Sequence, residues 1–312
     1  MKLGIKVGPS QDSEADITAA NPDFCEVWFD ISRQADYRGL FSFLEKSGTE
    51  AGLHYWGALP DGTWTTLAHP DEGVRRQTVQ LIRKTIDIAA EWKFTYVNIH
   101  PGARADVKID FSTESFRVAG PPVELKQSIG AFLTLYAGLH DYATSRGVVL
   151  TVETVPARVY NGWYNGSNRL KPFEAFELPL EAVLAAASAG YWVANDFAHT
   201  AASLTAGSAA DVWKALKIAT NRMSPKTRLV HVGFLIPPFN GTDYHDRLDN
   251  PGFTGGGAVP DRNQTKLLLK QFVRRSDVWV LAEPASDHVG NFRLLKTLAA
   301  DAMGPVKAAP AP

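Results

Sequence analysis

Two kinds of hydrophobic pattern alternate along the chain. Eight short runs rich in β-branched and aromatic residues are flanked by turn residues and are too short for typical helices, so they predict strands. These runs span residues 3–7, 24–29, 51–56, 94–100, 147–152, 191–197, 228–234 and 277–282. Between them, apolar residues recur three or four positions apart, which predicts amphipathic helices. The clearest helical segments span residues 72–92, 125–145, 179–189, 209–220 and 264–275.

Repeated strand–helix units favour a parallel sheet with crossover helices. Eight units predict an α/β protein with a single (β/α)8 TIM barrel, a fold that typically takes about 250 residues. An open doubly wound sheet is the alternative, but no glycine-rich phosphate loop follows the first run. We expect one domain over residues 1–302, long loops at 157–173 and 237–260, and a disordered tail at 303–312.

The composition limits which classes of partner and which cellular compartment we expect. The 312 residues carry 32 Lys plus Arg and 33 Asp plus Glu, so the chain has no overall basic field for nucleic acid. A single cysteine, Cys25, excludes an intrachain disulfide and a cysteine-built metal site. No apolar run reaches the roughly 18 residues of a membrane-spanning helix, and the first residues have no secretory pattern. We therefore expect a cytoplasmic protein without a membrane partner.

Polar residues gather where the predicted strands end, which in a TIM barrel is the face that carries the active site. Five of the eight histidines belong to this set. The third to eighth strands and the loop after the seventh supply His54, His100, Glu153, Asp196, His199, His231, Asp243, His245 and Glu283. Each one alone has an ordinary structural alternative; Asp196, for example, is also placed to cap a helix.

Three of these groups are carboxylates that converge on one rim: Glu153, Asp196 and Glu283. Burying like charges together costs several kcal/mol per ion and drives some of them to protonate. A bound cation removes both penalties. Imidazole and carboxylate ligands without thiolates suit zinc, manganese or iron, so we expect a divalent-metal site.

These residues lie in motifs that resemble the endonuclease IV-like, xylose isomerase-like TIM-barrel superfamily, known as AP endonuclease family 2. The similar pieces are LHYWG, TLAHPDEGVRRQTVQLIRK, NIHPG, VETVP, DFAHT, DYH and LAEPA, in order along nearly the whole chain. The resemblance implies up to three divalent ions, zinc first and manganese second. It assigns His54 and His100 to the first ion, with Glu153 bridging to the second. Asp196, His231 and Glu283 complete the second site, and His199, Asp243 and His245 form the third.

Several loops depart from the endonuclease IV pattern. VGPSQDSEAD replaces a glycine-rich stretch after the first strand, TVPARVYNGWYNGSNRL replaces the loop after the fifth, and the seventh strand reads HVGF instead of His-x-Asn-Asp. These are the loops expected to contact DNA. The departures therefore weaken abasic DNA as a substrate without affecting the ligand set.

The resemblance implies two enzymatic functions. The first is a phosphodiester hydrolase, possible substrates including DNA, in which a metal-bound hydroxide attacks phosphorus and Arg104 is a candidate phosphate contact. The alternative is a divalent-metal sugar or sugar-phosphate isomerase or epimerase, with Glu153 and Glu283 as the acid/base pair. Trp56, Trp64, Trp163 and Tyr164 suit a pocket for sugars or extruded bases, or simply anchor loops. A metal-bearing barrel that only binds a ligand is the third hypothesis, and no protein partner can be read from the sequence.

Overall fold

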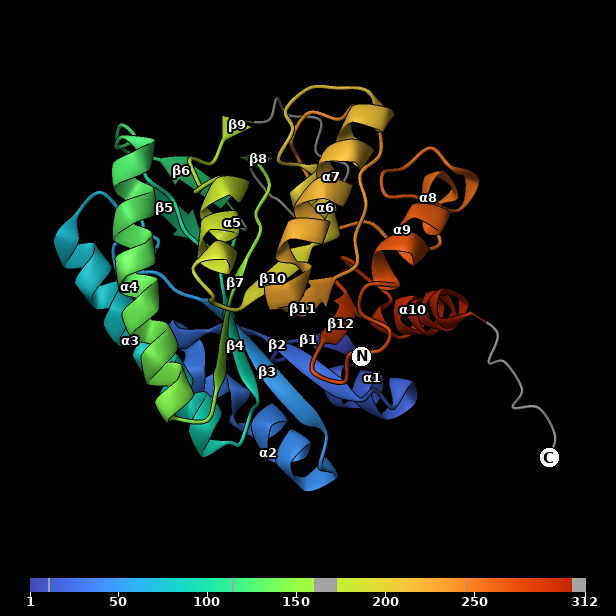
Figure 1. Ribbon diagram of the computed structural model, residues 1–312. Helices are drawn as coiled ribbons and strands as arrows, with labels where there is room; N and C mark the ends of the chain where they lie inside the picture. Colours follow the sequence, from blue (N-terminus) through green and yellow to red (C-terminus); the bar gives the residue numbers. More distant parts are fainter. Residues whose placement is uncertain (11, 114, 160–172, 244, 305–312) are drawn as a thin grey trace.

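A closed barrel of eight parallel strands forms the centre of the protein (Figure 1). The computed structural model describes residues 1–10, 12–113, 115–159, 173–243 and 245–304. Around the barrel the order is β1 (Lys2–Val7), β12 (Trp279–Ala282), β11 (Thr227–His231), β10 (Val193–Asp196), β7 (Val149–Glu153), β4 (Tyr96–Ile99), β3 (Glu50–Trp56) and β2 (Phe24–Asp30). Pairing of β1 with both β2 and β12 closes the ring, so the predicted (β/α)8 barrel is confirmed.

Helices follow the barrel strands and cover the outside of the barrel (Figure 1). The longer ones are α1 (Asp12–Ala20), α2 (Arg38–Ser47), α3 (Glu72–Glu91), α4 (Leu125–Ser145), α5 (Leu180–Ser188), α7 (Ala209–Met223), α9 (Arg262–Leu269) and α10 (His288–Met303). Shorter turns are the 3-10 segments η1 (Ile31–Tyr37) and η2 (Ser224–Lys226) and the helices α6 (Phe197–Ala201) and α8 (Pro251–Gly255). No helix among the described residues is long and apolar enough to cross a membrane.

Helix boundaries follow the predicted patterns closely, except at α9. This helix begins earlier than predicted because Asp261 and Gln264 form a reciprocal capping box at its start. It also ends earlier, at Leu269. The next residues form tight turns, in which the Phe272 amide donates to the Leu269 carbonyl and the Phe272 ring is fully buried. Burial of one ring against the barrel therefore ends a helix that the local pattern extended to residue 275.

Two small antiparallel sheets lie at the C-terminal end of the barrel (Figure 1). One pairs β5 (Val107–Asp110) with β6 (Ser115–Val118) after β4, and the other pairs β8 (Arg158–Val159) with β9 (Phe173–Glu174) after β7. Trp163 and Tyr164 of the predicted 157–173 loop lie outside the described residues. Most of the predicted tail does too: α10 continues to Met303, and the description stops at residue 304.

The N-terminal end of the barrel interior is filled by an apolar layer. Its buried members are Phe24, Tyr96, Ala194, Leu229, Trp279 and Leu281. Gly4 and Gly52 make room for it, because a Cβ atom at these positions would lie only 2.4 Å and 2.3 Å from the rings of Phe24 and Tyr96. Glu50 accepts a hydrogen bond from the Trp279 ring at this end, and the candidate site residues lie in the layers above, towards the C-terminal ends of the strands.

Candidate metal centre

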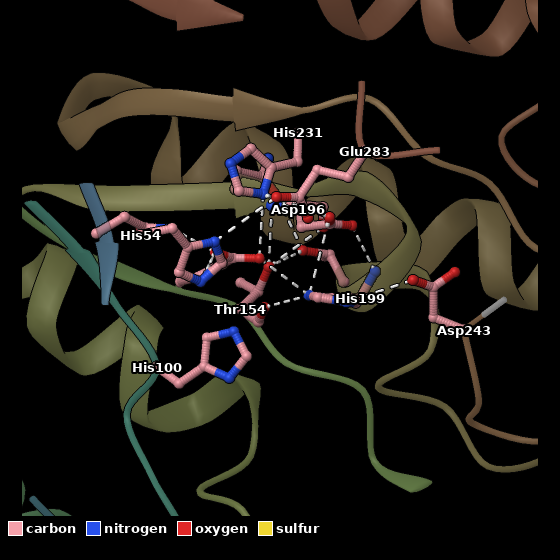
Figure 2. A network of polar contacts seen from close by, with 12 residues as sticks. His54, His100, Thr154, Asp196, His199, His231, Asp243 and Glu283 are labelled. Atoms are coloured by element: carbon pink, nitrogen blue, oxygen red, sulfur yellow. Dashed lines mark hydrogen bonds and ion pairs between the residues drawn. The ribbon is translucent and has the colours of Figure 1, made fainter. Parts of the chain in front are cut away.

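All nine residues singled out from the sequence lie at the C-terminal end of the barrel. Figure 2 labels all of them except Glu153 and His245. Glu153, Asp196 and His231 are the last residues of β7, β10 and β11, and His54 lies near the end of β3. His100 and Glu283 directly follow β4 and β12, His199 lies in α6, and Asp243 and His245 lie in the loop after β11. In Figure 2, His54 and His100 lie on one side of the site and Asp243 on the other, with His199 between them.

The nine side chains form three groups in which one ligand atom per residue lies within 4.8 Å of the others. The groups are His54, His100 and Glu153; Glu153, Asp196, His231 and Glu283; and His199, Asp243 and His245. We call the second one the four-ligand group. The structure thus brings together the residues that the sequence predicted to share metals, with Glu153 shared by two groups. That each of them binds a metal stays a prediction.

His231 lies at the centre of the four-ligand group. Its Nδ1 atom is 3.2 Å from Oε1 of Glu153, 3.3 Å from Oε2 of Glu283 and 3.7 Å from Oδ2 of Asp196. These carboxylates are nearly or fully buried. Three carboxylates and one imidazole with ligand atoms this close together form a donor set that suits a divalent cation.

The ionisation of the buried carboxylates differs from one to the next. Burial, reinforced by Asp243 and Glu153, raises the pKa of Asp196 to about 6 in spite of two nearby histidines. Burial acts on Glu153 in the same direction, but His231 and His54 outweigh it and hold the pKa of Glu153 below its usual range. Asp196 is therefore the carboxylate for which a bound cation makes the largest difference.

The two carboxylate oxygens of Asp196 contact different partners. Oδ1 accepts a hydrogen bond of 2.8 Å from the His199 amide and caps α6, while Oδ2 faces His231. The capping role expected as an alternative is therefore present, and it leaves the other oxygen directed at the four-ligand group.

His199 and His245 have ring orientations suited to a metal ligand. Nδ1 of His199 lies 2.8 Å from the Thr154 carbonyl, and Nδ1 of His245 lies 3.1 Å from the Glu283 carbonyl. A carbonyl only accepts, so each Nδ1 carries a proton, and in the neutral ring the lone pair is then on Nε2. Both Nε2 atoms face Oδ2 of Asp243, at 3.4 Å and 3.3 Å. The backbone carbonyls thus orient these rings as outer-sphere partners orient metal-binding histidines.

The sequence analysis missed several polar residues of the site, among them Lys6, Glu26 and Asn98. Lys6 and Glu26 face each other in the β1–β2 register, and both are in contact with His54. Asn98 pairs with His54 in the β3–β4 register and donates a hydrogen bond to Glu153. A charged residue inside an otherwise apolar strand, as in GIKV and FCEVWF, is the signal that could have identified the first two.

A cavity of about 440 Å³ opens onto the groups. Lys6, His54, His100, His199, Asp243, His245 and Glu283 line it, as do the aromatic rings of Trp28, Trp56, Phe111 and Phe116. The Trp64 ring stacks on the Trp56 ring, with 5.9 Å between the ring centroids, and does not line this cavity. Arg104, the predicted phosphate contact, does not line it either: it donates to the Val123 carbonyl and lies over the Phe176 ring.

Solved structures share this architecture over nearly the whole chain. An L-ribulose 3-epimerase is 16% identical, with a TM-score of 0.62, and the match covers 100% of this chain and 99% of that one. D-psicose 3-epimerase from Clostridium cellulolyticum H10 is 11% identical over 97% and 96%, with a TM-score of 0.59. Endonuclease IV from Thermus thermophilus is 14% identical over 96% and 100%, with a TM-score of 0.56.

Neither sequence comparison adds a relative: no family model and no curated protein matches this chain. At identities this low, the structural matches establish the fold and leave the reaction open. They agree with the barrel topology and with the resemblance found in the sequence. The chain has the closed (β/α)8-barrel fold that these sugar epimerases and endonuclease IV share.

Proposed function

We propose that this protein is a metal-dependent enzyme that isomerises or epimerises a sugar or sugar derivative at the carbon next to a carbonyl group. This is the alternative of the sequence analysis, and we place it ahead of phosphodiester hydrolysis. The observation that carries it is the four-ligand group below an aromatic-walled cavity that Glu283 lines directly. The solved structures with this fold support it, because most of those reported above are sugar epimerases.

The residues of the four-ligand group fit a divalent cation. One imidazole and three carboxylates form a donor set suited to manganese as well as to zinc. When bound there, the ion would polarise the carbonyl and the neighbouring hydroxyl of the substrate. Lowering the pKa of the substrate C–H in this way is what makes its deprotonation by a carboxylate feasible.

Glu283 is the carboxylate best placed to move that proton. It lines the cavity, and its two oxygens contact different partners, Lys6 and His231. Lys6 and His231 hold the pKa of Glu283 below its usual range despite burial, so the carboxylate is ionised and able to accept a proton. Glu153, the other member of the expected acid/base pair, is fully buried and does not line this cavity. In our proposal Glu153 holds the cation, and Glu283 removes and returns the proton.

The charge of the cavity favours a small polar substrate over a phosphodiester chain. Among the described residues, four carboxylates line it (Asp16, Glu177, Asp243 and Glu283), against three Lys or Arg side chains. Each of these three already contacts a protein group: Lys6 contacts Glu26, Arg33 contacts Asp36, and Arg158 contacts the Asn240 carbonyl. Tight DNA binding uses several Lys or Arg contacts to phosphates, which the described part of this wall does not offer.

One observation supports phosphodiester hydrolysis as the second candidate. His199, Asp243 and His245 form a separate group whose ring orientations suit a further ion beside the four-ligand group. Sites with several metal ions are common in enzymes that cleave phosphodiesters. Endonuclease IV activity on an abasic-site duplex therefore belongs in the same experiment.

Proton exchange with solvent tests the proposed reaction without knowledge of the natural substrate. Manganese-loaded protein is incubated in D2O with ketopentoses and ketohexoses, and NMR follows deuterium uptake next to the carbonyl and the appearance of a new epimer or isomer. We expect exchange on one of them, and Glu283→Gln to lower its rate by roughly 10²- to 10⁴-fold. The control Glu181→Gln changes an exposed residue of α5 and should keep the wild-type rate. Cleavage of the abasic duplex without any exchange on sugars would contradict the proposal.

A further inference from the structure

The cavity extends from the four-ligand group to aromatic rings on the opposite half of the barrel. The four ligands come from the ends of β7, β10, β11 and β12, which are neighbours in the ring of strands. The rings come from β2, from β3 and from the β5–β6 hairpin after β4, and they are Trp28, Trp56, Phe111 and Phe116. We call these four rings the aromatic cluster. A substrate whose carbonyl group lies at the four-ligand group leaves this half of the cavity to the rest of its atoms.

The aromatic cluster is supported from behind by Trp64. The Trp64 ring stacks on the Trp56 ring and packs against the Phe116 ring, with 5.4 Å between the centroids of the last two. The Trp64 amide also donates a hydrogen bond to the Val107 carbonyl, which joins the hairpin to the loop after β3. The cluster is therefore formed before a ligand binds, which lowers the ordering cost of binding.

Glu177 lies beside the aromatic cluster although it is distant in the sequence. The backbone after β9 runs antiparallel to the loop after β4, where Glu177 pairs with Ala103. This pairing places Oε1 of Glu177 at 3.4 Å from Nδ1 of His100, whose ring lies 4.8 Å from the Trp56 ring between centroids. Only 5% of the Glu177 side chain is exposed, and the residue lines the cavity.

Polar atoms of this region are buried without a hydrogen bond. Among the residues that the structure describes, Oε1 of Glu177 accepts no hydrogen bond and the Nε1–H group of Trp28 donates none. The contact between Glu177 and His100 does not satisfy the carboxyl oxygen, because neither ring nitrogen of His100 makes a hydrogen bond. Buried polar atoms are nearly always hydrogen-bonded, so we expect a ligand that supplies both a donor and an acceptor here.

A sugar ring matches this combination of groups. Its C–H faces pack on aromatic rings, and its hydroxyls donate to a carboxyl oxygen and accept from an indole N–H. An apolar group would leave Glu177 and Trp28 without partners, and a phosphate would meet a carboxyl group where it needs a cation. The cavity volume of about 440 Å³ lies in the range of pockets for drug-sized ligands, which are larger than one monosaccharide.

We propose that the aromatic cluster and Glu177 form a subsite for a second sugar unit, so that the substrate is a glycosylated keto sugar and not a free ketose. Glu177 is then the specificity-determining residue, which accepts a hydrogen bond from a hydroxyl of that second unit. Trp28 donates to another oxygen of the same unit. The inference rests on the proposed function, which places the carbonyl-bearing unit at the four-ligand group.

Binding of matched ketoses tests the subsite. Manganese-loaded wild type is titrated by calorimetry with D-fructose and with turanose, isomaltulose and lactulose, which are disaccharides of a fructose unit and a further hexose. We expect one of the disaccharides to bind roughly tenfold more tightly than fructose, or better still. A panel in which no disaccharide binds more tightly than fructose would overturn the proposal.

Replacement of Glu177 separates recognition of the second unit from a structural role. We expect Glu177→Ala to bind the preferred disaccharide roughly tenfold more weakly and to keep the fructose affinity within about twofold. The control Glu174→Ala changes an exposed residue of β9 in the same segment and should bind both sugars as wild type does. Equal losses for the disaccharide and for fructose would show that Glu177 only supports the fold, and would overturn the proposal.

A second variant tests the subsite even if Glu177→Ala does not fold. Trp28→Phe keeps an aromatic ring in the cluster and removes the N–H donor, so we expect a roughly three- to tenfold loss for the disaccharide alone. Trp213→Phe, on α7 outside the barrel, is the matched control. Unchanged binding of the disaccharide by Trp28→Phe would contradict the proposal.

Deuterium exchange on the same sugars distinguishes failure of the subsite from failure of the proposed function. Exchange on fructose without any preference for a disaccharide would keep the proposed function and overturn the subsite. Tighter binding of a disaccharide that depends on Glu177, without exchange on any of the sugars, would keep the subsite and reject the proposed reaction.

Discussion

Nε2 of His231 lies 3.1 Å from Oε1 of Glu26, a fully buried carboxylate of β2, while Nδ1 of the same ring faces the four-ligand group. The Tyr96 hydroxyl holds Glu26 from below by donating to its Oε2 at 3.0 Å. A carboxylate that accepts the second ring proton of a metal-binding histidine fixes the ring and makes its other nitrogen more basic. The apolar layer, through Tyr96 and Glu26, thus orients the imidazole of the proposed metal site.

Removal of the Glu26 charge should therefore weaken metal binding. We expect Glu26→Gln to lower the affinity for Mn²⁺ or Zn²⁺ by roughly 10- to 100-fold, the usual effect of losing an outer-sphere partner. Titration calorimetry measures it. Glu45→Gln, at an exposed position of α2, is the control and should bind as wild type does. Equal affinities of the two variants would show that Glu26 does not act through His231.

The Tyr96 hydroxyl should contribute to stability through the same contact. Tyr96→Phe removes a buried hydrogen bond to a charged acceptor, so we expect the free energy of unfolding to fall by about 1.5–3 kcal/mol in denaturant titrations. The control Tyr142→Phe removes a hydroxyl that donates to Asp87 on the helical surface and should cost less. A larger loss in the control would contradict the role given to Tyr96.

Metal affinity should rise with pH. Burial raises the pKa of Asp196 to about 6, and its proton must leave before the carboxylate can bind a cation. Burial acts to lower the pKa of His231, but the carboxylates of Glu153, Glu283 and Glu26 outweigh burial, and the net pKa lies above its usual range. The proton of His231 therefore still competes with the metal above pH 6. Each competing proton changes the apparent affinity by at most about tenfold per pH unit.

Calorimetry at half-unit steps from pH 5 to pH 8 measures this dependence. We expect the slope of log affinity against pH to be steeper below pH 6 than above it, and Asp196→Asn to remove the difference. An affinity that does not change between pH 5 and pH 6 would show that Asp196 is not among the ligands.

Packing at the bottom of the barrel should tolerate no extra methyl group. The Cβ atom of Gly52→Ala would lie 2.3 Å from the Tyr96 ring, so we expect a loss of about 1–3 kcal/mol, the usual cost of overpacking a core. Gly39→Ala is the control: it lies in α2 with nothing within 4 Å, and it should raise stability by about 0.4–1 kcal/mol. Thermal and denaturant unfolding of both variants test the pair.

The barrel and the candidate ligands could be predicted because each depends on a local regularity. Apolar runs mark strands, and polar residues at strand ends such as Glu153 and His231 mark the functional face. Both rules need only the order of residues along the chain.

Other features depend on contacts between distant residues. The end of α9 depends on the burial of Phe272, and the hairpin strands β5 and β6 are too short to leave a pattern. Lys6 and Glu26 look like ordinary charged residues of a strand until the barrel closes and places them against His54. The ring orientations of His199 and His245 likewise follow only from such contacts.

Metal content and thermal stability, measured together on chelator-treated and reloaded protein, test the central claim most directly. If the four-ligand group holds a cation, the reloaded protein retains at least one divalent ion per chain after removal of excess metal. At a metal concentration of a thousand times Kd the ion then adds about 4 kcal/mol of stability, so Tm rises by several degrees. No retained ion and an identical Tm with and without chelator would contradict the account.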